Sequence, residues 1–181
     1  MIVIDEAFID FVEQHSVKAI VRNNPYVIVL RSLTKYFSIP GLRLGYLIGD
    51  RLRVEQIAAH QEPWSINAPA MAVTLACLED PGFAAKTAGW LEKERKLLSQ
   101  RLTELGLFTV HPSQANFLLI RINRKGLNAL HLRTFLAEKR ILIRTCDSFG
   151  LGTEYFRIAV KRRKDNEHLL TALREWIAAN G

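Results

Sequence analysis

Cysteine is scarce in this 181-residue chain, which has only Cys77 and Cys146 and therefore cannot form a disulfide framework. No apolar run approaches the roughly 20 residues that a helix needs to cross a bilayer. The first residues, Met-Ile-Val-Ile-Asp, contain neither the basic segment nor the cleavage site of a secretory signal. These absences predict a cytoplasmic protein that has no membrane partner.

Metal-ligand patterns and repeats are also missing. The five histidines do not fall at the spacings of a metal site, and neither cysteine has a neighbouring zinc ligand. The chain contains no internal repeat and no low-complexity segment. The sequence therefore predicts no bound metal. Its 49% content of hydrophobic residues predicts a globular protein rather than a disordered one.

Positive charge is in moderate excess, because 25 lysines and arginines outnumber 18 aspartates and glutamates. The resulting net charge of +7 permits nucleic-acid binding. The one compact basic run is Lys161–Lys164, and a short run before a polar helix is more typical of a solvated helix face. We therefore expect no nucleic-acid partner. A basic protein that binds duplex in a salt-dependent way is the alternative.

Three short apolar runs open the chain, and each ends in polar residues or a glycine: Ile2–Ile4, Tyr26–Leu30 and Leu44–Ile48. Such runs are typical of buried parallel strands, and ligands of parallel sheets bind at the strand ends. No segment precedes the first run to build the rest of its sheet. We therefore expect part of a parallel sheet, and we hypothesise that the chain is the C-terminal half of a larger protein.

The remaining pattern is helical as far as Gly106 and then mixes strands with helices. Helices are predicted at Arg51–His60 and Ala68–Glu79 and in a long segment that ends at Gly106. Later elements are predicted at Leu107–Val110, Asn116–Ile122, Asn128–Lys139, Ile141–Arg144, Tyr155–Val160 and Asp165–Ala179. We thus predict an α/β protein with a partial large domain at residues 1–62, connecting helices at 63–106 and a small α+β domain at 107–181.

Four side chains near the first strands could carry chemistry. Lys35 follows an apolar run, where partial desolvation lowers the pKa of an amine and makes it a better nucleophile toward a carbonyl. Ser32 and Arg43 suit a phosphate, and Asp5 adds a carboxylate at the neighbouring strand end. A lysine, a carboxylate and a phosphate clamp are what pyridoxal phosphate requires. Each also has an ordinary alternative as a loop lysine, a turn hydroxyl, a surface arginine or a helix cap.

A family resemblance strengthens the cofactor hypothesis. Ser-x-x-Lys followed by Pro-Gly-Leu-Arg-x-Gly resembles the lysine signature of fold-type I, aspartate-aminotransferase-like pyridoxal-phosphate enzymes. The segment Ile-Val-Ile-Asp-Glu-Ala-Phe resembles their pyridine-nitrogen motif. Within this superfamily the chain is similar to the histidinol-phosphate aminotransferase branch, and most similar to the threonine-phosphate decarboxylases of cobalamin biosynthesis. The closer match rests on Asp5–Phe11, Leu33–Ile48, Pro63–Asn67 and Ala115–Leu119.

The resemblance implies a role for each candidate of the cofactor site. Lys35 would form the Schiff base with pyridoxal phosphate, and Asp5 would pair with the protonated ring nitrogen. Ser32 and Arg43 would hold the cofactor phosphate. One position departs from the family: many aminotransferases have a tyrosine where this chain has Phe8, whose ring cannot donate to the cofactor's ring oxygen. This difference favours the decarboxylases over the general aminotransferases.

The resemblance also implies a substrate site in the last part of the chain. Arg157 matches the position where the superfamily binds a carboxylate or another anion, and Arg144 matches a position that this branch uses for the substrate phosphate. Two guanidinium groups suit a small doubly anionic substrate, since each binds oxygens bidentately. Asn67 and Asn116 are further candidates for substrate contact.

The implied function is decarboxylation of L-threonine O-3-phosphate, a small phosphorylated amino acid, by a pyridoxal-phosphate enzyme that forms a homodimer at full length. The alternative is a histidinol-phosphate-type aminotransferase, in which Lys35 removes the proton from Cα. The resemblance covers only the second half of such an enzyme. We therefore expect this chain alone to bind the cofactor weakly and to turn over little or no substrate, or to be an inert folded fragment.

Overall fold

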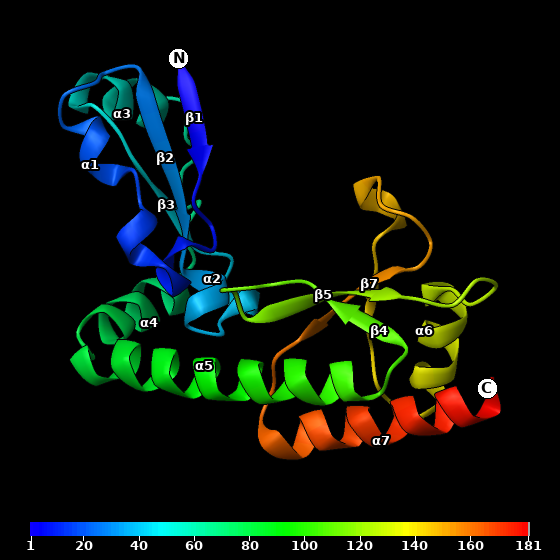
Figure 1. The fold of residues 1–181 in the computed structure, drawn as a ribbon. Helices are drawn as coiled ribbons and strands as arrows, with labels where there is room; N and C mark the ends of the chain where they lie inside the picture. Colours follow the sequence, from blue (N-terminus) through cyan, green and yellow to red (C-terminus); the bar gives the residue numbers. More distant parts are fainter. Residues whose placement is uncertain (181) are drawn as a thin grey trace. The chain divides into compact units, whose positions relative to one another are not determined.

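The computed structural model describes residues 1–180 and divides the chain into two compact units, Met1–Lys86 and Thr87–Gly181 (Figure 1). The division falls inside α5 (Pro81–Glu104), a 24-residue helix. Each unit has its own sheet, which confirms the predicted α/β class. Among the described residues, no helix is both long enough and apolar enough to cross a membrane.

The first unit contains a three-stranded sheet in the order β1-β2-β3. Its strands are β1 (Ile2–Asp5), β2 (Val27–Ser32) and β3 (Gly45–Ile48). Its helices are α1 (Lys18–Val21), α2 (Leu33–Tyr36), α3 (Arg51–Ala58) and α4 (Ala68–Leu78), and 3₁₀ turns lie at Ile9–Phe11, Glu13–His15 and Pro40–Leu42. The central strand supplies the core, because Val27, Ile28 and Val29 are buried.

The pairing of β3 corrects one prediction. β1 and β2 are parallel, but β3 runs antiparallel to β2, so the expected all-parallel sheet is wrong. The amide of Leu33 donates to the carbonyl of Leu44 (3.3 Å), and the chain therefore re-enters the sheet at the end where it left β2. Gly45 is required at this re-entry, since a Cβ there would lie 2.7 Å from the carbonyl oxygen of Arg31.

The strand β1 is an edge of this sheet with little cover. It pairs only with β2 among the described residues, through the register Ile2 to Val27 and Asp5 to Leu30. Ile2 is 58% exposed and Val3 is 54% exposed. The apolar run that predicts a buried strand thus lies largely at the surface of this unit.

Arg31, on β2, is the buried centre of an ion cluster that holds the loop after β1. Its guanidinium lies 2.8 Å from the Glu6 carboxylate and donates hydrogen bonds to Glu13 (2.7 and 3.1 Å), Asp10 (3.2 Å) and Ser16 (2.7 Å). Burial alone would lower the pKa of Arg31, but hydrogen bonding to Glu13 and the charges of Glu13 and Glu6 raise it. The same hydrogen bonds lower the pKa of Glu13, whereas burial raises the pKa of Asp10. Arg31 therefore stays charged and ties this loop to β2.

The second unit contains a four-stranded antiparallel sheet in the order β4-β5-β7-β6. Its strands are β4 (Phe108–Val110), β5 (Phe117–Ile122), β6 (Arg144–Thr145) and β7 (Tyr155–Ala159). Its other elements are α6 (Ala129–Glu138), α7 (Arg163–Ala179) and a 3₁₀ turn, η4 (Asp147–Phe149). Figure 1 shows α7 beside α5, and the ion pair between Arg101 and Glu167 (3.3 Å) joins the two helices.

Alternation along β5 and β7 gives this sheet two different faces. Leu118 and Ile120 of β5 and Phe156 and Ile158 of β7 are buried. They belong to a core that also contains Leu91, Leu98, Leu102, Leu132, Leu136, Leu169, Leu170, Leu173 and Trp176. The opposite face therefore carries the alternate residues, among them Arg157, and is free to carry polar groups.

The strand predicted at Ile141–Arg144 is present only at its end. Arg144 pairs with β7, but no backbone hydrogen bond among the described residues joins Leu142 to Ala159. Arg140, after α6, has a left-handed φ of 60°, and the amide of Ile141 still donates to the helix (2.9 Å, to the Leu136 carbonyl). The chain therefore leaves α6 too late to pair along the whole of β7.

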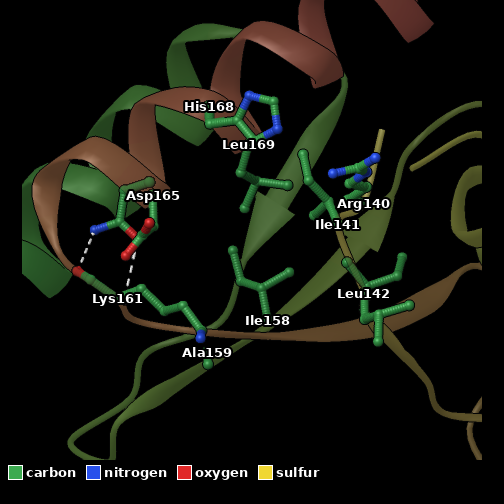
Figure 2. A pocket seen from close by; sticks show the side chains of 11 residues that line it. Arg140, Ile141, Leu142, Ile158, Ala159, Lys161, Asp165, His168 and Leu169 are labelled. Atoms are coloured by element: carbon green, nitrogen blue, oxygen red, sulfur yellow. Dashed lines mark hydrogen bonds between the residues drawn. The ribbon is translucent and has the colours of Figure 1, made fainter. Parts of the chain in front are cut away.

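A cavity of about 320 Å³ is lined by the segment after α6, the end of β7 and the start of α7. Figure 2 shows the side chains that line it, among them Ile158, Leu169, Lys161 and His168. None of the residues predicted to carry chemistry lines it.

We predict that the Arg31→Met variant destabilises the first unit by about 3–5 kcal/mol, because it leaves the Glu6 carboxylate buried without a counter-charge. Urea unfolding and hydrogen exchange of the β2 amides measure this loss. The matched control is Arg51→Met, since the Arg51 side chain is 88% exposed and its ion pair with Glu55 contributes at most about 0.5 kcal/mol. Equal stability losses in both variants would contradict the proposed weight of the buried cluster.

A second prediction concerns α7, whose Arg163 donates to Glu94 of α5 (2.8 Å). Hydrogen bonding from Arg163 lowers the pKa of Glu94 below its ordinary value of 4.5. The pair therefore stabilises the folded unit fully above the unfolded pKa, and this contribution is lost as pH falls through the lower native pKa. Between pH ~5 and ~3, the stability of Glu94→Gln should fall less steeply than that of the parent chain. Thermal unfolding at a series of pH values checks this, and parallel curves would refute it.

Candidate functional site

Lys35 lies in the single turn of helix that begins directly after β2. Its Nζ donates to the Ser32 hydroxyl (3.0 Å), and that hydroxyl also lies 2.8 Å from the hydroxyl of Thr34. Lys35 is half-buried, and its Nζ lies 5.5 Å from the centre of the Phe8 ring. The structure therefore places the Lys35 amine beside the Ser32 hydroxyl and the Phe8 ring, and the cofactor roles of Lys35 and Ser32 stay predictions.

Aromatic packing holds the α2 turn in place. The Tyr36 ring packs edge-on against Phe11 (5.2 Å), Phe37 (5.4 Å) and Phe83 (5.9 Å), and its hydroxyl donates to the Ala84 carbonyl (3.2 Å). Burial raises the pKa of Tyr36, with a smaller contribution from Asp10. Tyr36 thus acts as an anchor, and Lys35, the preceding residue, is half-buried rather than packed in the core.

Asp5 is the last residue of β1 and lies at the end of the sheet where β2 also ends. Its register partner is Leu30, two residues before Ser32, and the two strands are parallel, so their carboxyl ends meet. The Asp5 carboxylate is exposed and accepts a hydrogen bond from the amide of Ala7 (2.9 Å). The fold therefore brings Asp5 to the edge that carries Ser32 and Lys35.

The backbone of Arg43 lies near the end of β2, but its side chain makes no contact with Ser32 among the described residues. It precedes Leu44, whose carbonyl accepts from Leu33 at the start of α2. Its φ of 55° is in the left-handed region, a conformation that costs a non-glycine residue about 1–2 kcal/mol. The exposed guanidinium donates to the Pro40 carbonyl (2.9 Å). Its role as a phosphate ligand stays a prediction.

Asn67 has a structural task in the first unit. It is the N-cap of α4, where its Oδ1 accepts from the amide of Ala70 (2.8 Å) and its Nδ2 donates to the Leu42 carbonyl (3.1 Å). The amide therefore links α4 to the turn before Arg43. The predicted substrate contact of Asn67 would have to replace or share these hydrogen bonds.

Arg144 and Arg157 lie directly opposite each other on β6 and β7 of the second unit. Directly opposed residues of an antiparallel pair point to the same face, and like charges in that arrangement are destabilising. Arg144 is exposed and donates to the Ser148 hydroxyl (2.9 Å), whereas Arg157 is half-buried. Two arginines on one face give that face positive charge, and their role in binding an anion stays a prediction.

The Arg157 guanidinium is only partly satisfied by its surroundings. Its carbon Cζ lies 4.0 Å from the centre of the Phe117 ring and 5.3 Å from that of Phe149. Its Nε is buried and has no hydrogen-bond partner among the described residues. A buried donor without an acceptor is costly, and an incoming carboxylate or phosphate oxygen would remove that cost.

Two residues outside the predicted site, Phe149 and His111, lie near Arg157. Phe149 contacts Arg157, and Arg144 lies 5.4 Å from the same ring. The backbone amide of His111 donates to the carbonyl of Leu119 (2.9 Å), which is the register partner of Arg157. The buried side-chain Nε2 of His111 has no hydrogen-bond partner among residues 1–180. No local motif marks either residue, because strand pairing brings His111 to this face and the η4 turn brings Phe149 there.

Asn116, the last of the predicted residues, lies just before β5. Its backbone carbonyl accepts from the amide of Val160 (2.8 Å), and the residue is half-buried. Its side-chain role stays a prediction. No cluster of three or more histidine, cysteine, aspartate or glutamate residues in the described part of the chain could hold a metal ion.

Comparison with known proteins identifies the family of the chain. Residues 1–173 match the family described as aminotransferase class I and II. The chain is 41% identical to threonine-phosphate decarboxylase of Salmonella typhimurium over 177 residues, which are 96% of this chain and 48% of that protein. The chain thus spans about half the length of this curated relative.

Two solved structures have the same fold. The histidinol-phosphate aminotransferase of Clostridium acetobutylicum is 34% identical with a TM-score of 0.88, and the match covers 97% of this chain and 53% of that one. The L-threonine-O-3-phosphate decarboxylase of Porphyromonas gingivalis is 26% identical with a TM-score of 0.85, covering 97% and 55%. The chain is therefore a member of the aminotransferase class I and II family.

Proposed function

We propose that the chain is part of a pyridoxal-phosphate enzyme that decarboxylates L-threonine O-3-phosphate. The observation that carries the substrate class is the buried Nε of Arg157, which has no hydrogen-bond partner among the described residues, on a residue whose register partner is Arg144. Together they offer positive charge for two anionic groups, and threonine phosphate has a phosphate and a carboxylate. The similarity to threonine-phosphate decarboxylase at 41% identity supports this choice.

The donor set of the first unit fits pyridoxal phosphate. A primary amine, Lys35, lies within hydrogen-bond distance of the Ser32 hydroxyl, and the Asp5 carboxylate is exposed at the same sheet edge. The cofactor, when bound, supplies a ring that takes up the electrons left at the substrate Cα when a bond there breaks. Ser32 and Arg43 would bind its phosphate, and Lys35 would bind its carbonyl carbon.

Asp5 and Lys35 have separate tasks in this proposal. A carboxylate at position 5 favours a proton on the pyridine nitrogen, because an opposite charge stabilises the protonated form. The Lys35 amine would supply a proton to Cα after carbon dioxide leaves. The Ser32 hydroxyl, which accepts from Lys35 at 3.0 Å, would hold the amine near that position.

Phe8 favours one of the two candidate reactions. Its ring lies 5.5 Å from the Lys35 Nζ and has no hydroxyl to donate to the ring oxygen of the cofactor. The resemblance indicates a tyrosine there in many aminotransferases, so this position favours decarboxylation. The alternative, a histidinol-phosphate-type aminotransferase, is supported by the solved structure with a TM-score of 0.88.

The whole enzyme is proposed to be about twice as long as this chain and to act as a homodimer. Its matched relative extends well beyond the aligned residues, since only 48% of that protein is covered. We propose that the uncovered part supplies further cofactor and substrate contacts. The 181-residue chain should therefore bind the cofactor weakly.

We predict that borohydride reduction in the presence of pyridoxal phosphate attaches the cofactor to Lys35 in preference to other lysines. Lys35→Gln should reduce the incorporated cofactor at least about tenfold, whereas Lys125→Gln, in an exposed loop, should leave it unchanged. Absorbance after reduction and peptide mass mapping measure the amount and the position. Labelling spread evenly over the lysines would show that position 35 has no special reactivity.

We also predict that Arg144→Gln weakens binding of inorganic phosphate to the chain about tenfold, because it removes one charged hydrogen-bonding group. Arg157→Lys should weaken binding several-fold, since a lysine keeps the charge but loses the planar fork. Arg51→Gln removes the same charge from the exposed helix α3 and should have no effect. Calorimetric titration gives the three affinities, and equal values would count against an anion site on β6 and β7.

A further inference from the structure

One aromatic ring lies beside both arginines of the second unit. The centre of the Phe149 ring is 5.4 Å from the Arg144 guanidinium carbon and 5.3 Å from that of Arg157. Both distances are within the range of a cation–π interaction. Yet Phe149 is 52% exposed, so burial in the core does not explain its position.

The local chain fixes this ring in place. Phe149 ends η4, and its amide donates to the carbonyl of Cys146 (3.0 Å), a fully buried residue directly after β6. Gly150 follows with a left-handed φ of 73° and donates to the Asp147 carbonyl (3.2 Å). This closed turn constrains the backbone at Phe149, whose ring lies near the guanidinium of Arg144.

The ring offsets an electrostatic cost. Arg144 and Arg157 repel each other across the β6–β7 pair, and each would otherwise turn away toward water. The negative face of an aromatic ring attracts both cations at once, without neutralising either. Phe117, 4.0 Å from Arg157, supplies a second ring, and Ser148 holds Arg144 from the side. The free site is thereby arranged before an anion arrives.

We infer that Phe149 is a positioning residue that holds the two guanidinium groups together for one phosphorylated, carboxylate-bearing ligand. This inference rests on the proposed function of the Arg144 and Arg157 pair and adds to it the residue that sets their spacing. Its physical basis is preorganisation: side chains that are already ordered lose less freedom when a ligand binds. A leucine at position 149 would fill much the same volume but would present no negative face.

The test uses the full 181-residue chain and inorganic phosphate as the probe, titrated by calorimetry. Phe149→Leu should weaken phosphate binding about three- to tenfold. The phosphate affinity of Phe149→Tyr should stay within about twofold of that of the parent chain, since a phenol keeps the π face. The matched control is Phe135→Leu, because Phe135 lies 5.1 Å from the amine of Lys139 and contacts neither arginine. This control should leave phosphate affinity unchanged.

A thermal melt of each variant separates positioning from folding. A purely structural ring would change the melting temperature of Phe149→Leu and leave its phosphate affinity equal to that of the parent chain, which would overturn the inference. If Arg144→Gln weakens binding and Phe149→Leu does not, the inference fails while the anion site stands. If no arginine substitution matters, or the parent chain binds no phosphate, the proposed anion site fails and the inference fails with it.

Discussion

The first unit depends on one buried guanidinium. Arg31 stands on the central strand, and its charge is shared among Glu6, Glu13 and Asp10 of the loop that follows β1. Because Glu6 is the residue after Asp5 and Arg31 is the residue before Ser32, this cluster joins the two strand ends that carry the proposed cofactor site. A charge buried in this way is costly alone, so the carboxylates and Arg31 require one another.

Much of the fold follows from the sequence, and the exceptions have physical causes. The segments predicted at Tyr26–Leu30 and Asn116–Ile122 contain strands, and Gly106 follows the end of α5. The direction of β3 was missed because it depends on the Leu33–Leu44 hydrogen bond, a contact between segments that no local pattern encodes. The predicted strand at Ile141–Arg144 is present only as the short β6 for the same reason, since an apolar run predicts burial but not a pairing partner.

The candidate site divides in a similar way. Lys35 and Ser32 are close in the chain, and their hydrogen bond follows from one turn of helix after a strand. Asp5 reaches the same edge only because β1 and β2 are parallel. Phe149 could not be found from sequence, because its contacts cross between a turn and two strands. Motif spacing and family resemblance thus identify candidate residues one at a time, whereas the contacts that the fold assembles between distant segments, such as those of Phe149 with both arginines, require the structure.

The open side of β1 has a consequence for handling the protein. Alternate amide and carbonyl groups along that side have no neighbouring strand among the described residues, and Ile2 and Val3 present apolar surface beside them. An uncovered, apolar strand edge is a template on which another strand can add. Concentrated solutions of this chain are therefore prone to self-association that extends the sheet from one molecule to the next, and a charged residue at position 3 would be the simplest way to suppress it.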